Sequence, residues 1–312
     1  MCLTVDMASK TILRHVEKVR ALSKPGQPLG PDAPTSTMYN PAWWMNGEPT
    51  PTRDRLHRRL LEEVRLAAPD VQQENRALVL AGPPGAGKGA VKKTVLGDKM
   101  PTFLNIDADE FKRLLLHEAK ADGSYDTWIL PDVVRQLESE GEQFFPLELA
   151  SLVHEESSYL AKALRDDAIQ AGDNIIVDTV LADEAKALAL GGLLAEAGYD
   201  VEVVDVEVPF GLSEQRIQSR WRHSYEAALD SGGTELGGRW VPSEYARDVF
   251  TGTGGQSKPE AAARSLAEKC EAVTRYRVYR TGMDQAHMQN AVPVLEIHKH
   301  RKEHGASLLD VD

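Results

Sequence analysis

From residue 76 onward, short apolar runs alternate with longer stretches in which hydrophobic residues recur at helical spacing. The apolar runs, which predict buried β-strands, cover residues 77–80, 103–106, 175–177, 201–208 and 292–297. The helical stretches cover residues 88–96, 108–120, 147–171, 183–197, 213–229 and 258–280. Because alternating strands and helices favour a parallel sheet with right-handed crossovers, we expect an α/β fold whose sheet is flanked by helices.

The beginning of the chain has a different pattern. Residues 7–22 and 52–67 each carry apolar side chains at helical spacing with charges between them. Seven prolines from Pro25 to Pro51 exclude regular structure from most of the segment that joins these helices. We therefore expect a helical and Pro-rich extension over residues 1–72, an α/β domain over residues 73–300 and a solvated tail over residues 301–312.

Two clusters outside the α/β pattern have a structural and a functional interpretation. Trp43 and Trp44 in the Pro-rich segment predict a loop pinned to the body by its indoles, with substrate stacking as the alternative. His298, His300 and His304 are typical of a charged strand exit, with metal binding as the alternative.

Composition narrows the class of protein. The 312 residues include 36 basic and 48 acidic side chains, and the net charge of −12 argues against a protein that coats nucleic acid. The two cysteines cannot make a disulfide framework, and no apolar run has the length of a secretory signal or a membrane span. We expect a soluble cytoplasmic protein with neither a nucleic-acid nor a membrane partner.

The most specific motif is a glycine-rich loop between a predicted strand and a predicted helix. It consists of Gly82, Pro83, Pro84, Gly85, Ala86, Gly87, Lys88, Gly89 and Ala90. Glycines at this place let backbone N–H groups surround phosphate oxygens, the helix adds its positive end, and the lysine reaches the β- and γ-phosphates. The loop predicts that the chain binds a nucleoside triphosphate.

The residue after the loop lysine departs from the phosphate-loop pattern. It is Gly89, whereas Ser or Thr at this position supplies a hydroxyl to Mg²⁺. Since Mg²⁺ keeps several waters and needs only one or two carboxylates, another acid can support it. Asp178, which ends the run Asn174-Ile-Ile-Val, is our candidate metal residue.

Acids and arginines elsewhere in the chain suit phosphoryl transfer. Asp107 and Asp109 follow the second strand, and a carboxylate there can accept a proton from an attacking hydroxyl while the other caps the helix or contacts the substrate. We take Asp109 as the base. Arg216 and Arg220 share a helical face, and Arg239 follows a Gly-rich stretch, so these guanidinium groups can bind the substrate and the moving phosphoryl group.

The combined motifs favour a small-molecule kinase. The base-reading Asn-Lys-x-Asp motif of GTPases is absent, and the chain is too short for a motor or transporter ATPase. The segments GPPGAGK, IDADEFK, LVHEESSYLAK, NIIVDT and GRWVP resemble, in order and spacing, the zeta toxin family over about residues 74–255. The resemblance implies a kinase of bacterial toxin–antitoxin systems that uses ATP and Mg²⁺, with an antitoxin protein as a candidate partner.

The resemblance also implies residue roles. Lys88 corresponds to the phosphate-loop lysine, Asp109 to the general base, and Arg220 and Arg239 to the arginines that contact the triphosphate. The helix that carries His154, Glu155, Ser157 and Ser158 corresponds to the one that lines the sugar-nucleotide cleft. We place Asp107, His154, Glu155, Ser158 and Arg216 among the substrate-binding residues.

Three functions stay open at this point. The favoured acceptor, on resemblance alone, is the 3′-hydroxyl of UDP-N-acetylglucosamine, and NAD is the second candidate. A non-catalytic nucleotide-binding module is the alternative from another class, and Gly89 is the feature that favours it. The extension is not explained by the family pattern, and one hypothesis is that its first helix is a built-in inhibitor of the nucleotide cleft.

Overall fold

The computed structural model describes residues 2–233, 235–282, 285 and 292–311. The chain folds into two compact units, each assembled from three stretches of sequence. Unit 1 comprises Met1–Glu62, Ala108–Ala161 and Ile217–Glu244, and unit 2 comprises Glu63–Asp107, Lys162–Arg216 and Tyr245–Asp312.

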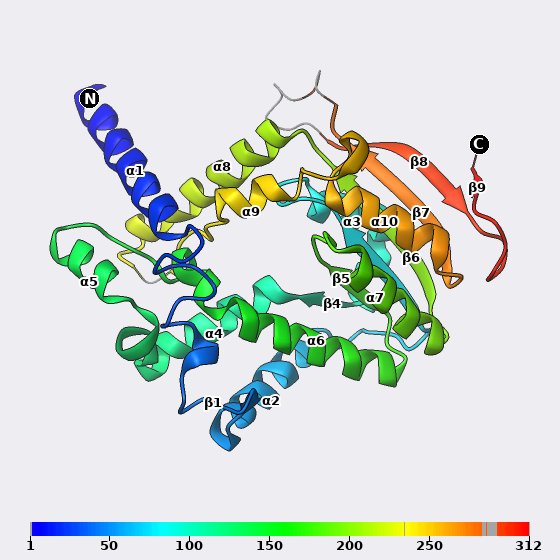
Figure 1. Cartoon of the computed structure of the whole chain (residues 1–312), viewed down its shortest axis with the longest axis horizontal. Coiled ribbons are helices and arrows are strands. Elements are labelled where there is room, and N and C mark those ends of the chain that lie inside the picture. The colour runs from blue at the N-terminus through cyan, green and yellow to red at the C-terminus, as the bar shows by residue number, and fades with distance from the viewer. Residues whose placement is uncertain (1, 234, 283–284, 286–291, 312) are drawn as a thin grey trace. The chain divides into compact units, whose positions relative to one another are not determined.

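Unit 2 is built on a seven-stranded sheet (Figure 1). In spatial order its strands are β4 (Leu104–Asp107), β5 (Ile175–Asp178), β3 (Arg76–Ala81), β6 (Asp200–Glu207), β7 (Val273–Arg280), β8 (Val294–His300) and β9 (Leu309–Asp310). The pairs from β4 to β7 are parallel, whereas β8 and β9 are antiparallel additions at one edge. This confirms the expected α/β fold with a mostly parallel sheet.

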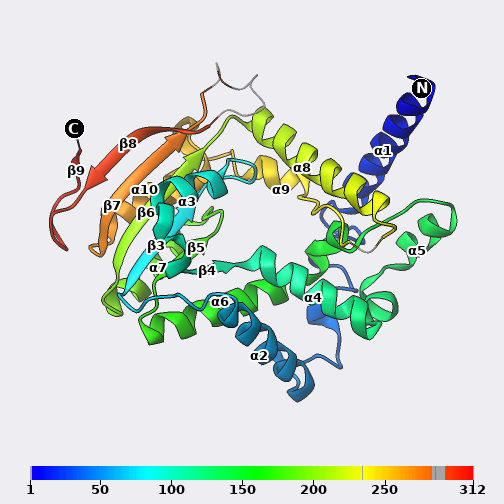
Figure 2. The same cartoon turned by 180° about the vertical axis from the view of Figure 1, so that it is seen from behind.

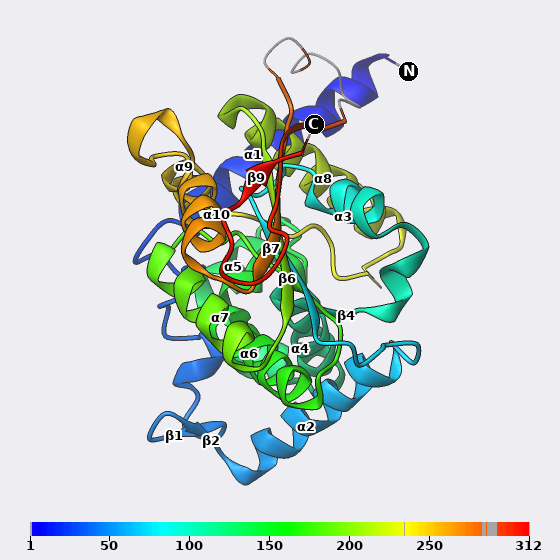
Figure 3. The ribbon, with the colours of Figure 1, turned by 90° about the vertical axis from the view of Figure 1, so that its right-hand side faces the viewer.

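Helices cover both faces of this sheet. On the face toward the viewer in Figure 1 lie α7 (Glu184–Glu196) and α10 (Lys258–Lys269). On the other face, which Figure 2 shows from behind, lies α3 (Lys88–Leu96), and Figure 3 shows both layers with the sheet between them. The strands β3, β5 and β6 are rich in apolar residues because both of their faces are buried. The cluster under α3 includes Leu78, Leu80, Val91, Ile176, Val204, Val206 and Leu212.

Strand β7 was missed by the sequence pattern. The predicted helix over residues 258–280 is wrong in its second half, because α10 ends at Lys269 and β7 begins at Val273. Arg275 and Arg277 give β7 a polar pattern, and the structure explains it, since both pair with Glu202 on the neighbouring β6 at 3.5 Å and 3.1 Å. The alternation of these charges with apolar residues is the period of a strand.

The predicted tail contains a buried side chain and a short strand. Arg301 is buried and donates to the backbone carbonyls of Cys270 (3.0 Å) and Ala267 (3.1 Å), and β9 pairs with β8. His298 and His300 lie in β8, opposite β7. Within the described ranges, no three His, Cys, Asp or Glu side chains are grouped as a metal site.

Unit 1 is mainly helical. Its elements are α1 (Cys2–Leu22), η1 (Thr37–Tyr39), β1 (Trp44–Met45), β2 (Glu48–Pro49), most of α2 (Pro51–Leu66), α4 (Ala108–Asp122), η3 (Tyr125–Ile129), α5 (Asp132–Ser139), η4 (Pro146–Val153), the start of α6 (His154–Ala171) and most of α8 (Phe210–Asp230). Unit 2 also contains η2 (Gly97–Thr102), η5 (Thr253–Gly255) and most of α9 (Ser243–Asp248). No helix in the described ranges is apolar over the length that a bilayer crossing requires.

Residues 147–171 form two helices instead of the single predicted helix. Residues 146–153 are a 3₁₀ segment, η4, and α6 begins at His154. Pro146 stands at the start of η4, where its missing N–H costs no hydrogen bond, and the Glu148 carboxylate accepts from the N–H of Phe145 at 2.9 Å. These local bonds define a separate start before α6.

The two indoles of the extension are packed as the anchoring interpretation predicts. Trp44 is buried, and its ring lies 5.7 Å from His57 and 5.4 Å from Tyr159. The Arg53 guanidinium lies 4.1 Å from the ring centroid of Trp43. Both side chains therefore fix the Pro-rich segment within unit 1.

Candidate active site

The glycine-rich loop of unit 2 has a backbone that only glycine can form at three positions. Gly82, Gly85 and Gly87 have φ of 130°, 75° and 101°. At Gly82 a Cβ would lie 2.2 Å from the carbonyl oxygen of Val206, so no side chain fits there. The Lys88 amine donates to the carbonyl of Gly82 at 2.7 Å, and α3 begins at this lysine. The strand, loop and helix thus have the arrangement that binds phosphate at a helix N-terminus.

Side chains from the start of α8 hold this loop from within unit 2. The Nη1 atom of Arg216 donates to the carbonyls of Gly85 and Ala86, each at 3.2 Å. The hydroxyl of Ser213 donates to the carbonyl of Pro84 at 2.6 Å. Arg216 therefore brings a second positive charge to the loop and fixes its shape, and Ser213 is a loop contact that the sequence pattern did not reveal.

The carboxyl edge of the sheet carries the candidate metal residue. Asp178 on β5 lies opposite Asp107 on β4 in the parallel register. The Lys92 amine lies 3.3 Å from the Asp178 carboxylate and donates to the side-chain oxygen of Asn105 at 3.0 Å. Nothing lies within 4 Å of the position that a Cβ at Gly89 would take. The Asp178 carboxylate, with no hydroxyl at position 89, fits a Mg²⁺ ion whose other ligands are phosphate and water.

Asp109, the predicted base, lies in the first turn of α4 in unit 1. Its carboxylate is 3.0 Å from the Arg239 guanidinium and accepts from the Lys112 amine, also at 3.0 Å. Burial by itself would raise the pKa of Asp109, but the charges of Arg239, Lys112 and, more weakly, Arg220 outweigh it and hold the pKa below its ordinary value. Asp109 is therefore ionised near neutral pH, the form that can accept a proton.

The helix predicted to line the substrate cleft presents its polar residues to different degrees. Glu155 is exposed, whereas His154 and Ser158 are half-buried. Burial and the nearby charge of Lys112 lower the pKa of His154, which is therefore neutral at pH 7. His154 and Lys112 thus belong to the surroundings of Asp109, and the two other side chains stay substrate-binding predictions.

The buried carboxylate of this helix is Glu156, which the sequence pattern did not single out. It accepts from Arg53 at 2.5 Å and 2.8 Å and contacts the Nε2 atom of His57 at 2.6 Å. Burial alone would raise the pKa of Glu156, but the bonds from His57 and Arg53 lower it to about 2. Because both partners come from α2, Glu156 ties the extension to α6 and has a structural role.

The predicted site residues fall into two groups, each within one unit. Unit 2 carries residues 82–90 with Lys88, Asp107, Asp178 and Arg216, and unit 1 carries Asp109, His154, Glu155, Ser158, Arg220 and Arg239. Each group also contains one lysine that the sequence analysis did not predict. Lys92 lies one helical turn after Lys88, and Lys112 one turn after Asp109, so helical spacing was the available signal.

Comparison with known proteins identifies the family. The family model for zeta toxins matches residues 62–291, which is more than half of the chain. No curated protein sequence is detectably similar to this chain.

Solved structures share the fold at low sequence identity. The native AvrRxo1-ORF1:-ORF2 complex contains a chain with a TM-score of 0.53 and 18% identity, over 92% of this chain and 75% of that one. A chain of the same complex with ATP has a TM-score of 0.53 and 17% identity, over 85% of this chain and 71% of that one. A chain of the PezAT chromosomal toxin–antitoxin system of Streptococcus pneumoniae has a TM-score of 0.47 and 15% identity, over 73% of this chain and 78% of that one. At these identities the likeness to the AvrRxo1 complexes concerns the fold, and it is the family match, together with the phosphate loop, that shows that this chain belongs to the zeta toxin family.

Proposed function

We propose that this chain is a kinase that transfers the γ-phosphate of ATP to a hydroxyl group of a nucleotide-like small molecule. The observation that carries the proposal is the Asp109 carboxylate, which contacts Arg239 and Lys112 in a chain whose other unit contains a phosphate loop. Family membership supports a toxin kinase of this kind. The 3′-hydroxyl of UDP-N-acetylglucosamine is the proposed acceptor, and NAD is the second.

Each residue has a defined part in the proposed reaction. Lys88, Arg216 and the loop amides bind the triphosphate. Asp109 accepts the proton of the acceptor hydroxyl as its oxygen attacks the γ-phosphorus, the bond to the β-phosphate oxygen breaks, and ADP leaves. Arg220 and Arg239 stabilise the negative charge on the transferring group. A bound Mg²⁺, held by Asp178 through water, would neutralise phosphate charge.

Two further parts of the proposal come from the family and from one residue. Family membership supports a protein partner of the antitoxin type, and co-expression of a candidate antitoxin that restores growth would test it. Gly89, which offers no hydroxyl to a metal, favours the alternative that the chain binds nucleotide without turnover.

The experiment incubates the full-length protein with ATP, Mg²⁺ and a panel of acceptors that includes UDP-N-acetylglucosamine and NAD, with mass spectrometry of the products. We expect a phosphorylated acceptor that disappears in Asp109→Ala. Glu110→Ala is the matched control, because Glu110 is the next residue of α4 and pairs with Arg113 at the surface. ATP binding without product from any acceptor would overturn the kinase proposal in favour of the non-catalytic module.

Binding measurements separate the roles of the two units. Lys88→Ala removes a charged hydrogen-bond donor from the triphosphate and should weaken ATP binding by about 10- to 100-fold. Asp109→Ala should leave ATP affinity nearly unchanged, since the base acts on the acceptor hydroxyl. Equal losses in calorimetric titrations would show that these two roles are misassigned.

A further inference from the structure

Each of the two arginines near Asp109 is followed in the sequence by a buried tryptophan. Trp221 comes after Arg220, and Trp240 comes after Arg239. The two indole rings pack edge to face, with centroids 5.8 Å apart and an interplanar angle of 89°. Between them, a Cβ at Gly238 would lie 2.3 Å from the carbonyl oxygen of Trp221, so the backbone before Arg239 rests directly on α8. The paired indoles thus fix the two stretches of chain that carry the arginines.

The extension binds one of these indoles directly. The Nε1–H of Trp240 donates to the hydroxyl of Ser23 at 2.9 Å, and both side chains are buried. Ser23 lies just after the end of α1, where its N–H donates to the carbonyl of Val19 at 3.0 Å. Because a buried indole N–H is unfavourable without an acceptor, this bond restricts where Trp240 can lie.

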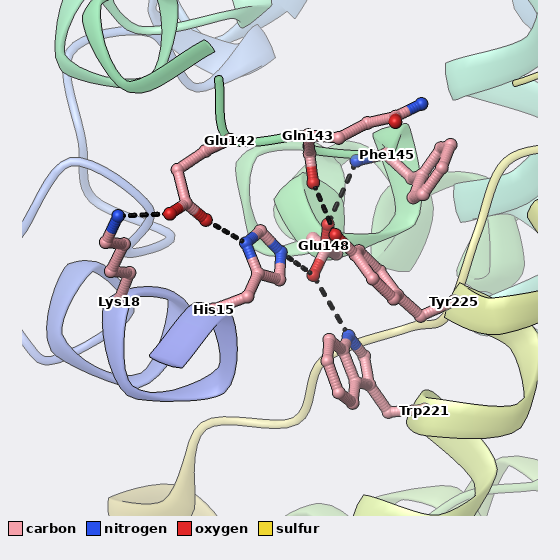
Figure 4. A network of polar contacts seen from close by, with 8 residues as sticks. All are labelled: His15, Lys18, Glu142, Gln143, Phe145, Glu148, Trp221 and Tyr225. Carbon is pink, nitrogen blue, oxygen red and sulfur yellow. Dashed lines mark hydrogen bonds and ion pairs between the residues drawn. The ribbon is translucent and has the colours of Figure 1, made fainter. Parts of the chain in front are cut away.

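The extension reaches the second indole through a buried carboxylate (Figure 4). The Nε1–H of Trp221 donates to Glu148 at 3.1 Å, and the same oxygen of Glu148 contacts the Nε2 atom of His15 at 2.9 Å. The other ring nitrogen of His15 contacts Glu142 at 3.0 Å. His15 also stacks on Tyr225, one turn after Trp221 on α8, with ring centroids 4.8 Å apart.

We infer that the N-terminal extension is a positioning element for Arg220 and Arg239, which it orients toward Asp109 through the buried indoles of Trp221 and Trp240. Ser23 and His15, its two contact points, lie outside the residues 62–291 that match the family. The expected effect of this positioning on kcat rests on the proposed kinase function. The expected effect on the contact between Asp109 and Arg239 does not.

The inference gives the extension a role opposite to that of a built-in inhibitor. A displaced guanidinium loses its bond to Asp109 and its alignment with a transferring phosphoryl group, and errors in alignment of about 1 Å can cost 100-fold in rate. Loosening the extension should therefore lower activity, whereas removing an inhibitor should raise it.

The test uses three single substitutions in the full-length chain. Trp240→Phe and Ser23→Ala each remove one side of the bond between the extension and the loop that carries Arg239. Trp128→Phe is the matched control, because the Nε1–H of Trp128 also donates to the extension, at the Ser36 carbonyl (3.3 Å), but no site arginine adjoins it. Circular dichroism and thermal midpoints establish whether each variant is folded. If Trp240→Phe does not fold, Ser23→Ala still tests the loss of this bond.

Two readouts are compared among the folded variants. We expect kcat for the acceptor that the wild type phosphorylates to fall about tenfold in Trp240→Phe and Ser23→Ala, with KM for ATP nearly unchanged. We also expect the pKa of Asp109, followed by NMR of carboxyl-labelled protein, to rise toward its ordinary value as Arg239 moves away. Trp128→Phe should change neither quantity.

The outcomes distinguish this inference from the proposed function. An unchanged Asp109 pKa in folded Trp240→Phe and Ser23→Ala, or an equal change in Trp128→Phe, overturns the positioning role. A rise in kcat overturns it in favour of inhibition. If the wild type phosphorylates no acceptor, the kinase proposal fails, and the Asp109 pKa still decides whether the extension positions Arg239.

Discussion

The guanidinium of Arg239 lies 3.0 Å from the carboxylate of Asp109, although the two residues come from distant stretches of unit 1. The pair helps to explain how a half-buried acid near the start of α4 remains ionised, because the charges of Arg239, Lys112 and Arg220 together outweigh the effect of burial on its pKa. It also places the proposed base beside a group that can stabilise a moving phosphoryl group. One contact therefore serves both ionisation and charge stabilisation.

Replacing Arg239 should separate these two effects. In Arg239→Gln the pKa of Asp109 rises, so the acid limb of the pH profile of kcat/KM should move to higher pH. The loss of charge stabilisation should lower kcat by about 100- to 1,000-fold. Arg113→Gln is the control, since Arg113 pairs with the neighbouring Glu110. An acid limb at the same pH in both variants would contradict the pairing.

Gly89 gives a direct test of metal use. The position has room for a side chain on a helix, so Gly89→Ser should fold and place a hydroxyl where phosphate-loop proteins bind Mg²⁺. We expect the Mg²⁺ concentration for half-maximal ATP binding to fall. Gly89→Ala should stabilise the helix by about 0.5–1 kcal/mol but adds no ligand for Mg²⁺, so it is the control for the change in helix propensity. Identical Mg²⁺ titrations of the two variants would show that the hydroxyl is not used.

His15 should make the stability of the fold depend on pH. Burial by itself lowers the pKa of His15, but the bonds and charges of Glu148 and Glu142 raise it above 6.5 overall. Protonated His15 therefore stabilises the folded chain fully below pH 6.5, and this contribution is lost as the pH rises through the raised pKa. The free energy of unfolding, measured in urea from pH 6 upward, should fall more steeply in wild type than in His15→Gln. If the free energy of unfolding fell equally with pH in the two proteins, His15 would not contribute to the pH dependence.

Glu207 predicts a second pH dependence, in unit 2. Burial raises the pKa of this carboxyl at the end of β6 to about 7, although the Ser257 hydroxyl donates to it at 2.7 Å. Because the unfolded chain ionises near 4.5, stability should be lost between pH 4.5 and 7, by about 3 kcal/mol at most. Glu207→Gln should flatten this part of the curve, whereas Glu196→Gln, at the exposed end of α7, should not. Equal slopes in the two variants would exclude Glu207 as the cause.

The sequence predicted best what depends on contiguous residues. The apolar runs around residues 77–80 and 175–177 became β3 and β5, and the predicted glycine-rich loop lies between β3 and α3. These features are encoded locally, since a strand needs its own apolar residues and a phosphate loop needs its own glycines. The same approach failed for β7, whose arginines are explained only by Glu202 on the next strand.

By itself, then, the sequence determined the α/β class, the phosphate loop and the family. The tertiary structure alone decided that Arg239 pairs with Asp109 and that Arg216 binds the backbone of the loop. It also decided that Ser23 and His15 hold the neighbours of the two arginines. The reason is physical: these contacts join side chains that are far apart in the chain, and only packing of the folded elements brings them within hydrogen-bond distance.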